Sequence, residues 1–498
     1  MRATVIVDPH RVIGQVDPLI YGQFLSRRRW VADEALYDPT HPDADASGLR
    51  RSAVTALAES APTIIRWPGG CTGTSYDWRG GIGPRGDRDR TIDAHFGYDV
   101  GNGFGTAEFV EFCRRIGAEP HLNFNTGTGT LRDALEWIEY ANFTTDSRWA
   151  NLRREHGYPE PFGVRYWQIG NENYGPWEIG HQSPREYAVM ARDWAKAIKK
   201  LDSSLQVLAV GGSEARSGSP AWDVAVLEEA WEHIDYLTAH RYWDFNSGRG
   251  VDNYDAIAGT GYLEEQTIRS LSGLIDLVAR EKRSARRPML AFTEWNARDQ
   301  WQKEMSDVWH PVDTQYRLVD ALAAAGFLNA LQRQCNIVGL ATVAQSINVV
   351  GLLFVTPDAL VRETVYWACL MQRRYSGATA VDAVVECDGY TAQFEDRSVA
   401  GVPYLDISAT LDTTMQRLFL SLVNRHRTDE LVTRFRLRDT AIAGPGVLHQ
   451  LWHDDPLARN TRDAPDAIAP TESALALSGA DLEVALPPHS YSIIEVQL

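Results

Sequence analysis

Short apolar segments recur along the first three quarters of the chain, and several are bounded by glycine or proline. Many of their residues are β-branched or aromatic, and the apolar runs are nearly continuous rather than alternating. Strands that are buried on both faces of a parallel sheet have this pattern. The pattern predicts eight strands, at Pro18–Leu25, Thr63–Trp67, Pro120–Asn125, Arg165–Glu172, Gln206–Gly211, Ile234–Tyr242, Pro288–Trp295 and Val338–Gln345.

Most of these strands are followed by a segment with helical periodicity, in which apolar residues recur at a spacing near 3.6. One helix start is marked clearly, because Ser183 can cap the helix, Pro184 suits its first position and Glu186 suits its third. The predicted helices are Ser47–Ser60, Thr106–Ile116, Ser183–Lys200, Ala221–His233, Leu263–Lys282 and Thr314–Gln334.

Alternating strands and helices indicate an α/β fold with a parallel sheet, and eight such units indicate a closed (β/α)8 TIM barrel over residues 18–375. An open, doubly wound sheet is the alternative, and the count of eight favours the barrel. After residue 375 the pattern changes to strands separated by turn residues, which is typical of an antiparallel β-sandwich over residues 376–498. Residues 1–17 include a strand that we expect to join this C-terminal domain.

The composition narrows the class of protein. The 498 residues carry a formal net charge of −17, which argues against a nucleic-acid partner. The five cysteines are scattered and lack the spacing of a zinc site or a disulfide framework, as expected in a reducing compartment. No secretory signal or membrane-spanning run is recognisable. We therefore expect a cytoplasmic protein without a membrane partner, a metal site or a cofactor.

Two glutamates are placed for chemistry, because Glu172 and Glu294 end the predicted fourth and seventh strands. A barrel carries its active site at the carboxyl ends of its strands, and the fourth and seventh strands face each other across its mouth. Glycoside hydrolysis requires two such carboxyl groups, one as acid and one as base or nucleophile. A glutamate near a strand end is more often solvated or ion-paired, but the joint occurrence of the pair favours catalysis.

Three further residues lie at strand ends. Arg66 ends the second strand, where its guanidinium can bind a carboxylate and keep it ionised; closing the barrel or a loop is the structural alternative. His240 and Tyr242 end the sixth strand and, by alternation, share one face. The tyrosine hydroxyl could orient a nucleophilic glutamate, whereas a single histidine is more often a core residue.

At these motifs the sequence resembles the α-L-arabinofuranosidases of glycoside hydrolase family 51. The segments that carry the likeness follow the family's order along nearly the whole chain. They are Ile20–Gly22, Arg66–Cys71, Trp78–Pro84, Phe104–Phe109, Gly170–Trp177, Glu294–Asn296, Gln345–Val349 and Leu486–Ser490.

The resemblance implies a (β/α)8 barrel with a β-sandwich, and a retaining mechanism in which Glu172 is the acid/base and Glu294 the nucleophile. Asn171 would hold the 2-hydroxyl of the sugar. Arg66, Tyr242 and Gln345 match positions around the nucleophile and the glycone subsite, Cys71 matches a sugar-contacting loop position, and His240 fits the same pocket. Trp177 could offer an apolar platform for a sugar ring. Members of the family are commonly hexamers, so the resemblance implies a homo-oligomer.

One position departs from the family pattern. The loop after the first strand usually reads Gly-x-Phe-Ile-Glu-His, and its glutamate binds the arabinofuranose; here Ser26 stands in that place, followed by Arg27, Arg28 and Arg29. Losing a charged hydrogen bond to the substrate costs about 1.5–3 kcal/mol. Ser26 would leave room for a bulkier furanoside, such as a β-D-galactofuranoside.

The sequence therefore predicts a retaining exo-glycosidase that releases terminal α-L-arabinofuranosyl residues from oligosaccharides. One alternative is another specificity on the same machinery, namely a galactofuranosidase, a xylosidase or an endo-glucanase. The other is a carbohydrate-binding protein on a disabled hydrolase fold.

Overall fold

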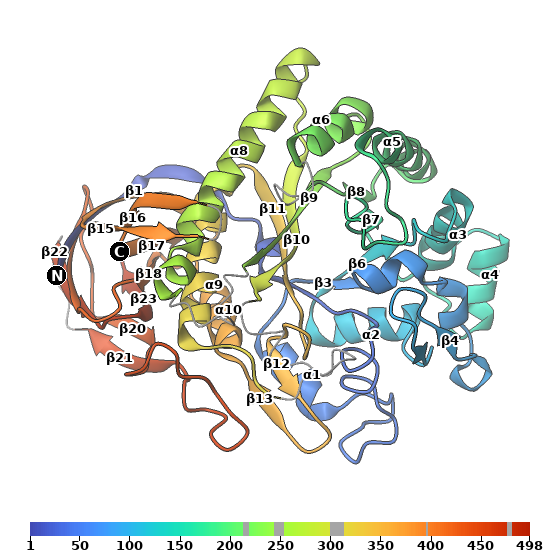
Figure 1. The fold of residues 1–498 in the computed structure, drawn as a ribbon, viewed down its shortest axis with the longest axis horizontal. Coiled ribbons are helices and arrows are strands. Elements are labelled where there is room, and N and C mark those ends of the chain that lie inside the picture. Colours follow the sequence, from blue (N-terminus) through green and yellow to red (C-terminus); the bar gives the residue numbers. More distant parts are fainter. Residues whose placement is uncertain (213–218, 244–252, 299–312, 395–396, 476–480) are drawn as a thin grey trace.

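The computed structural model describes residues 1–212, 219–243, 253–298, 313–394, 397–475 and 481–498. Its centre is a closed barrel of eight parallel strands in chain order (Figure 1). The barrel closes where the last strand pairs with the first, with Thr342 opposite Gly22. The strands are β2 (Gly22–Phe24), β3 (Ile64–Trp67), β6 (Glu119–Phe124), β7 (Tyr166–Ile169), β8 (Gln206–Ala209), β9 (Tyr236–Trp243), β10 (Met289–Ala297) and β11 (Val338–Ala344). The predicted barrel is confirmed, and the open sheet is excluded.

The first strand is shorter than predicted. Residues Pro18–Tyr21 form a 3-10 turn, since Pro18 suits its first position and the Asp17 carboxylate accepts a hydrogen bond from the backbone N–H of Leu19 at 3.0 Å. Only Gly22–Phe24 joins the sheet. The chain therefore leaves the barrel wall early, and Ser26 lies in the loop at the mouth.

The six predicted helices are all present, although two of them begin four residues later than expected, at Arg51 and Leu318. They are α1 (Arg51–Glu59), α2 (Thr106–Ile116), α5 (Pro184–Leu201), α6 (Ser219–Ala230), α8 (Thr260–Glu281) and α9 (Leu318–Arg333). Four more were not predicted: α3 (Leu131–Asn142), α4 (Arg148–Glu155), α7 (Tyr254–Ala258) and α10 (Thr364–Arg374). None of the helices in the described ranges combines the length and apolarity that crossing a membrane requires.

A nine-stranded sheet forms the second part of the molecule, at the left of Figure 1. The strand order is β21-β20-β23-β18-β17-β14-β1-β19-β22. The N-terminal strand β1 (Arg2–Gln15) lies inside it, antiparallel to β14 and parallel to β19. The others are β14 (Thr379–Cys387), β17 (Leu405–Asp412), β18 (Arg417–Asn424), β19 (Leu431–Leu437), β20 (Gly446–Leu451), β21 (Thr471–Leu475), β22 (Asp481–Leu486) and β23 (Ser490–Gln497).

The sheet has its own apolar cluster, to which β1, β17, β18, β19 and β22 all contribute side chains. The expected C-terminal β-domain is confirmed, with its strands joined in one continuous sheet. The domain boundaries near residues 17 and 375 stay a prediction. Three short hairpins complete the elements: β4 (Thr91–Ile92) with β5 (Asp99–Val100), β12 (Leu353–Val355) with β13 (Leu360–Arg362), and β15 (Gly389–Gln393) with β16 (Ser398–Pro403).

Helix α9 joins the barrel to this sheet through a buried polar network. The Asp406 carboxylate on β17 accepts a hydrogen bond from Asn329 of α9 at 2.8 Å and pairs with Arg425 at 2.9 Å. All three side chains are buried. Because a buried charge is tolerated only with partners, this network ties the sheet to one side of the barrel.

Candidate active site

A cavity of about 690 Å³ lies at the carboxyl ends of the barrel strands. Side chains near or beyond the carboxyl ends of six strands line it, namely Ser26, Cys71, Glu172, Tyr242, Glu294 and Gln345, together with Trp177. Arg66, Asn171 and His240 contact the two glutamates or their neighbours instead of lining the cavity. The ten residues singled out in the sequence are thus gathered around one cavity, although they span more than three hundred positions.

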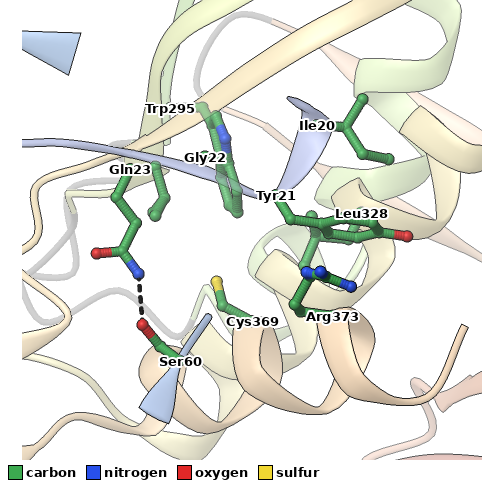
Figure 2. Close-up of a pocket in the computed structure, with 10 residues that line it drawn as sticks. Ile20, Tyr21, Gly22, Gln23, Ser60, Trp295, Leu328, Cys369 and Arg373 are labelled. Atoms are coloured by element: carbon green, nitrogen blue, oxygen red, sulfur yellow. Dashed lines mark hydrogen bonds between the residues drawn. The ribbon is translucent and has the colours of Figure 1, made fainter. Parts of the chain in front are cut away.

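A second hollow lies between the barrel wall and helices α9 and α10 (Figure 2). Tyr21, Leu328, Cys369 and Arg373 line it, and Gln23 donates a hydrogen bond to the Ser60 hydroxyl at 2.8 Å beside it. Its volume is only about 10 Å³, which is roughly the space for one water molecule. A sugar ring therefore does not fit there.

The two glutamates face each other across the cavity. One carboxylate oxygen of Glu172, one of Glu294 and a ring nitrogen of His240 all lie within 4.8 Å of one another. In retaining glycosidases the two carboxyl groups are about 5–5.5 Å apart, and in inverting enzymes about 6.5–9.5 Å. The observed separation belongs to the retaining class, in which no water fits between the second carboxylate and the sugar.

Glu294 is held by two strong hydrogen bonds. Arg66 Nη1 donates to Oε1 at 2.6 Å, and the Tyr242 hydroxyl donates to Oε2 at 2.7 Å. The Arg66 side chain is fully buried, and burial together with the Glu294 charge raises the pKa of Tyr242 well above its usual value. Tyr242 therefore stays a hydrogen-bond donor. Arg66 and Tyr242 together hold the Glu294 carboxylate in one orientation.

Glu172 lies three residues beyond the end of β7, where it adopts a left-handed backbone conformation with φ of 41°. Its Oε1 is hydrogen-bonded to His240 Nδ1 at 2.8 Å, and its Oε2 accepts from Trp177 Nε1 at 2.7 Å. Burial favours the neutral form, but the hydrogen bond and charge of His240 outweigh it and lower the pKa of Glu172 below its usual range.

The remaining predicted residues have distinct places. Asn171 is fully buried, and its Oδ1 accepts from Arg66 Nη2 at 2.7 Å. Gln345 accepts from the backbone N–H of Ser26 at 3.2 Å, which joins the ends of the last and first strands. The Ser26 hydroxyl is buried and has no hydrogen-bond partner among the residues that the structure describes. Trp177 is 50% exposed at the rim.

Glu178 was missed in the sequence, although it follows Glu172 in the same loop. Its Oε1 accepts a hydrogen bond from Asn171 Nδ2 at 2.9 Å, and Thr74 Oγ1 lies 3.0 Å from its Oε2. The Thr74 hydroxyl also lies 2.8 Å from the backbone oxygen of Cys71 and has a single proton for both contacts. The Thr74 hydroxyl can therefore donate to Glu178 or to the Cys71 carbonyl, while the Asn171 amide donates to the other oxygen of Glu178.

Burial and the nearby charge of Glu172 raise the pKa of Glu178 to about 7. His95 and Phe96 line the cavity although they were not singled out in the sequence, and Arg28 of the changed loop lines it too. Arg28 stacks on the Phe96 ring, 4.0 Å from its centroid. The loop that carries His95 and Phe96 has no local signal of function, since tertiary contacts alone bring it to the cavity.

We expect Glu178→Gln to stabilise the protein at pH 8 but not at pH 4.5. The pKa of Glu178 is near 7 in the fold and 4.5 for an ordinary glutamate, so the folded protein keeps a proton that the unfolded chain releases. Stability therefore falls as the pH rises from 4.5 to about 7, by at most about 3 kcal/mol. The amide carries no such penalty. Thermal unfolding of variant and wild type across this pH range measures the difference.

Glu186→Gln is the matched control, because Glu186 is an exposed helix-capping residue whose hydrogen bonds with Ser183 lower its pKa. It should gain no stability at pH 8. If the difference in Tm between Glu178→Gln and wild type did not grow with pH, Glu178 would be ionised in the fold without penalty and the assignment of a retained proton would be wrong.

Family models match two long parts of the chain. The "Alpha-L-arabinofuranosidase 1 domain" matches residues 56–257, which hold the barrel from α1 to beyond β9. The "Alpha-L-arabinofuranosidase C-terminal domain" matches residues 293–490, from within β10 to the start of β23. Glu172 lies in the first match and Glu294 in the second.

Individual relatives are similar over most of their length. Alpha-L-arabinofuranosidase C of Emericella nidulans is 35% identical over 425 residues, which cover 82% of each chain. An intracellular exo-alpha-(1->5)-L-arabinofuranosidase of Halalkalibacterium halodurans is 29% identical over 92% of each chain. Among solved structures, an arabinose complex of the alpha-L-arabinofuranosidase of Thermotoga maritima superposes over all of both chains, with a TM-score of 0.89 and 32% identity.

Proposed function

Since this chain belongs to glycoside hydrolase family 51, the α-L-arabinofuranosidase family, we propose that it is a retaining exo-α-L-arabinofuranosidase that removes terminal arabinofuranosyl residues from oligosaccharides. The observation that carries this proposal is the carboxylate pair. Glu172 and Glu294 present oxygens within 4.8 Å of each other at a cavity large enough for a furanose ring. The alternative reading of these residues, as isolated solvated carboxylates, does not fit their burial.

In the first step, Glu294 attacks the anomeric carbon while Glu172 protonates the glycosidic oxygen. The bond to the leaving alcohol breaks, and a covalent glycosyl ester forms on Glu294. In the second step, Glu172 removes a proton from water, the water oxygen bonds to the anomeric carbon, and the ester bond to Glu294 breaks. Two inversions at one carbon give net retention.

The neighbours of each glutamate suit these opposite tasks. Arg66 and Tyr242 each donate a hydrogen bond to Glu294, which holds its carboxylate in one orientation for attack. Glu172 must gain and lose a proton in each cycle, and its 2.8 Å contact with His240 fixes the position of the carboxyl group. The fixed amide of Asn171, between Arg66 and Glu178, suits a hydrogen bond to the 2-hydroxyl.

The cavity supports exo action on a single terminal sugar. Side chains at the ends of six barrel strands surround it, and the half-exposed Trp177 stands at its rim beside the acid/base. An aromatic face in that position can stack on the sugar ring of the leaving group. Long polymers would thus be approached from their ends.

A screen of nitrophenyl glycosides tests the proposal. We expect turnover of the α-L-arabinofuranoside to exceed that of the β-D-galactofuranoside and the β-D-xylopyranoside, in kcat/KM, by about tenfold or more, because a cavity fitted to a pentofuranose disfavours an added hydroxymethyl group or a larger ring. An endo-enzyme would instead lower the viscosity of a polymer solution faster than it releases sugar. Binding without turnover of any glycoside would favour a disabled carbohydrate-binding protein.

One observation favours a β-D-galactofuranosidase as second candidate. The buried Ser26 hydroxyl has no hydrogen-bond partner within the described ranges, and Arg28 lines the same cavity. A buried hydroxyl without a hydrogen bond costs about 1–3 kcal/mol, which an additional substrate hydroxyl could recover. A kcat/KM on the galactofuranoside equal to or above that on the arabinofuranoside would establish this candidate and reject the first.

We further propose a cytoplasmic location and a homo-oligomeric, hexameric assembly. The five free cysteines and the intracellular bacterial relative support the compartment. The assembly rests on the family resemblance, and light scattering would measure it directly.

A further inference from the structure

A second group of ligand-type side chains adjoins the carboxylate pair. Cys71 Sγ, a ring nitrogen of His95 and a carboxylate oxygen of Glu178 all lie within 4.8 Å of one another. They come from three separate loops: Cys71 follows β3, His95 lies between β4 and β5, and Glu178 follows β7. Glu178 is only 4% exposed, whereas the other two are partly exposed.

This combination of groups is the one that zinc prefers. Thiolate sulfur, imidazole nitrogen and carboxylate oxygen are its three common protein ligands, and three of them leave a fourth tetrahedral position open. Cys71 and His95 both line the 690 Å³ cavity, whereas Glu178 does not. The open position would therefore be on the side of the sugar pocket.

The other group of this kind among the described residues suits a cation less well. Glu172, His240 and Glu294 also lie within 4.8 Å of one another, but they include no sulfur. Arg66 already neutralises Glu294 through a 2.6 Å ion pair. Among the described residues, no lysine or arginine forms an ion pair with Glu178, whose carboxyl accepts hydrogen bonds from Asn171 and Thr74, so a metal ion there would not have to displace a cationic side chain.

The charges around Cys71 also favour a cation. Burial and the carboxylates of Glu178 and Glu172 raise the pKa of the Cys71 thiol well above its usual value. The same field that disfavours a free thiolate attracts a divalent ion, which brings two positive charges into a region of carboxylates. When the ion binds, the thiol proton of Cys71 and the carboxyl proton of Glu178, where it is held, leave to solvent, and bonds from the sulfur and the carboxylate oxygen to the metal form.

We propose that Cys71, His95 and Glu178 form a binding site for a thiophilic divalent cation of the zinc class, and that the bound cation blocks the sugar pocket. The first part stands on geometry alone. The second part rests on the proposed function, since Cys71 then lies where the sugar binds. An ion with its water ligand at the open position would occupy the space that a sugar hydroxyl needs, and inhibition would be competitive.

Cadmium titration of the chelator-stripped full-length protein tests the site, because cadmium thiolates absorb in the ultraviolet. We expect one equivalent to bind with a thiolate-to-metal absorption. Cys71→Ser should abolish this absorption, and His95→Ala should weaken binding by about tenfold or more. Cys387→Ser is the matched control, because Cys387 lies in β14 of the C-terminal sheet, and it should bind as wild type does. An unchanged titration of Cys71→Ser would overturn the site.

Kinetics with zinc test the blockade separately. We expect zinc to raise KM on the best aryl furanoside while kcat stays constant, and to do so less in His95→Ala than in wild type. If zinc bound without raising KM, the proposal that the cation blocks the sugar pocket would be wrong, whereas the proposal of a metal site would stand. If cadmium bound to a protein that turned over no glycoside, the proposed glycosidase function would be wrong and the metal site would stand. Failure of the proposed function is therefore distinguishable from failure of the metal site.

Discussion

Replacing Glu294 by alanine is expected to lower turnover of every glycoside by on the order of 10⁵-fold. The substitution removes the atom that bonds to the anomeric carbon. The variant should regain turnover with sodium azide, which fits into the space left by the carboxylate. The azide product should have the inverted anomeric configuration, because only one displacement then occurs. Nuclear magnetic resonance of the product measures this directly.

The structure also predicts a loss of stability in this variant, which must be separated from the loss of chemistry. Arg66 is fully buried and pairs with Glu294 at 2.6 Å, so its charge loses its partner. Breaking a buried pair costs about 3–5 kcal/mol. Glu108→Gln is a matched control, since Glu108 pairs with the buried Arg88 at 2.9 Å, away from the cavity. It should lose stability and keep turnover. Full turnover in Glu294→Ala, or an azide product with retained anomeric configuration, would show that Glu294 is not the nucleophile.

The barrel could be predicted because its signal is local. Each strand is buried on both faces, so its own composition marks it without reference to a partner. The same reasoning misplaced several strand ends: Glu172 lies beyond the end of β7, and Glu294 does not close its strand, since β10 continues to pair with β9 as far as Ala297 opposite Trp243. An irregularity in this pairing between Phe292 and Glu294 shifts the register, and alternation along one strand does not reveal it.

Two of the helices that were not predicted, α3 and α10, were missed for different reasons. Helix α3 could have been found, because Thr130 and Asp133 form a capping box and Ala134, Trp137, Ile138 and Ala141 repeat with helical spacing. Helix α10 could not be recognised in this way. It is packed on most sides, so its buried residues Val365, Tyr366, Ala368, Leu370, Met371 and Gln372 leave no polar face to give a period.

The residues of the candidate site also fall into those that the sequence could predict and those that it could not. Residues at strand ends could be assigned from the order of strands, since the barrel brings those ends together wherever they stand in the sequence. His95 could not, because only tertiary contacts bring its loop to the cavity. Glu178 is intermediate. Its distance of six positions from Glu172 was visible, but its role depends on a hydrogen bond to Asn171 that no spacing rule predicts.

The effect of replacing Glu172 should depend on the leaving group. In Glu172→Ala, kcat/KM is expected to fall by about 10⁴-fold for an arabino-oligosaccharide, whose alcohol must be protonated as it departs, and by only about tenfold for a dinitrophenyl furanoside, whose phenolate needs no proton. The glycosyl ester on Glu294 should then accumulate, because water lacks its base. Burst kinetics and intact mass of the protein would detect that ester.

Azide separates this role from that of Glu294 by stereochemistry. In Glu172→Ala, azide attacks the ester that Glu294 has already formed, so two displacements occur and the product keeps its configuration, opposite to the result for Glu294→Ala. Glu178→Gln is the control within the same loop, since it removes a neighbouring carboxylate and should leave the dependence on the leaving group unchanged. Equal losses for both substrates in Glu172→Ala would mean that Glu172 only positions the substrate. In that case His240, 2.8 Å away, would have to be tested as the proton donor.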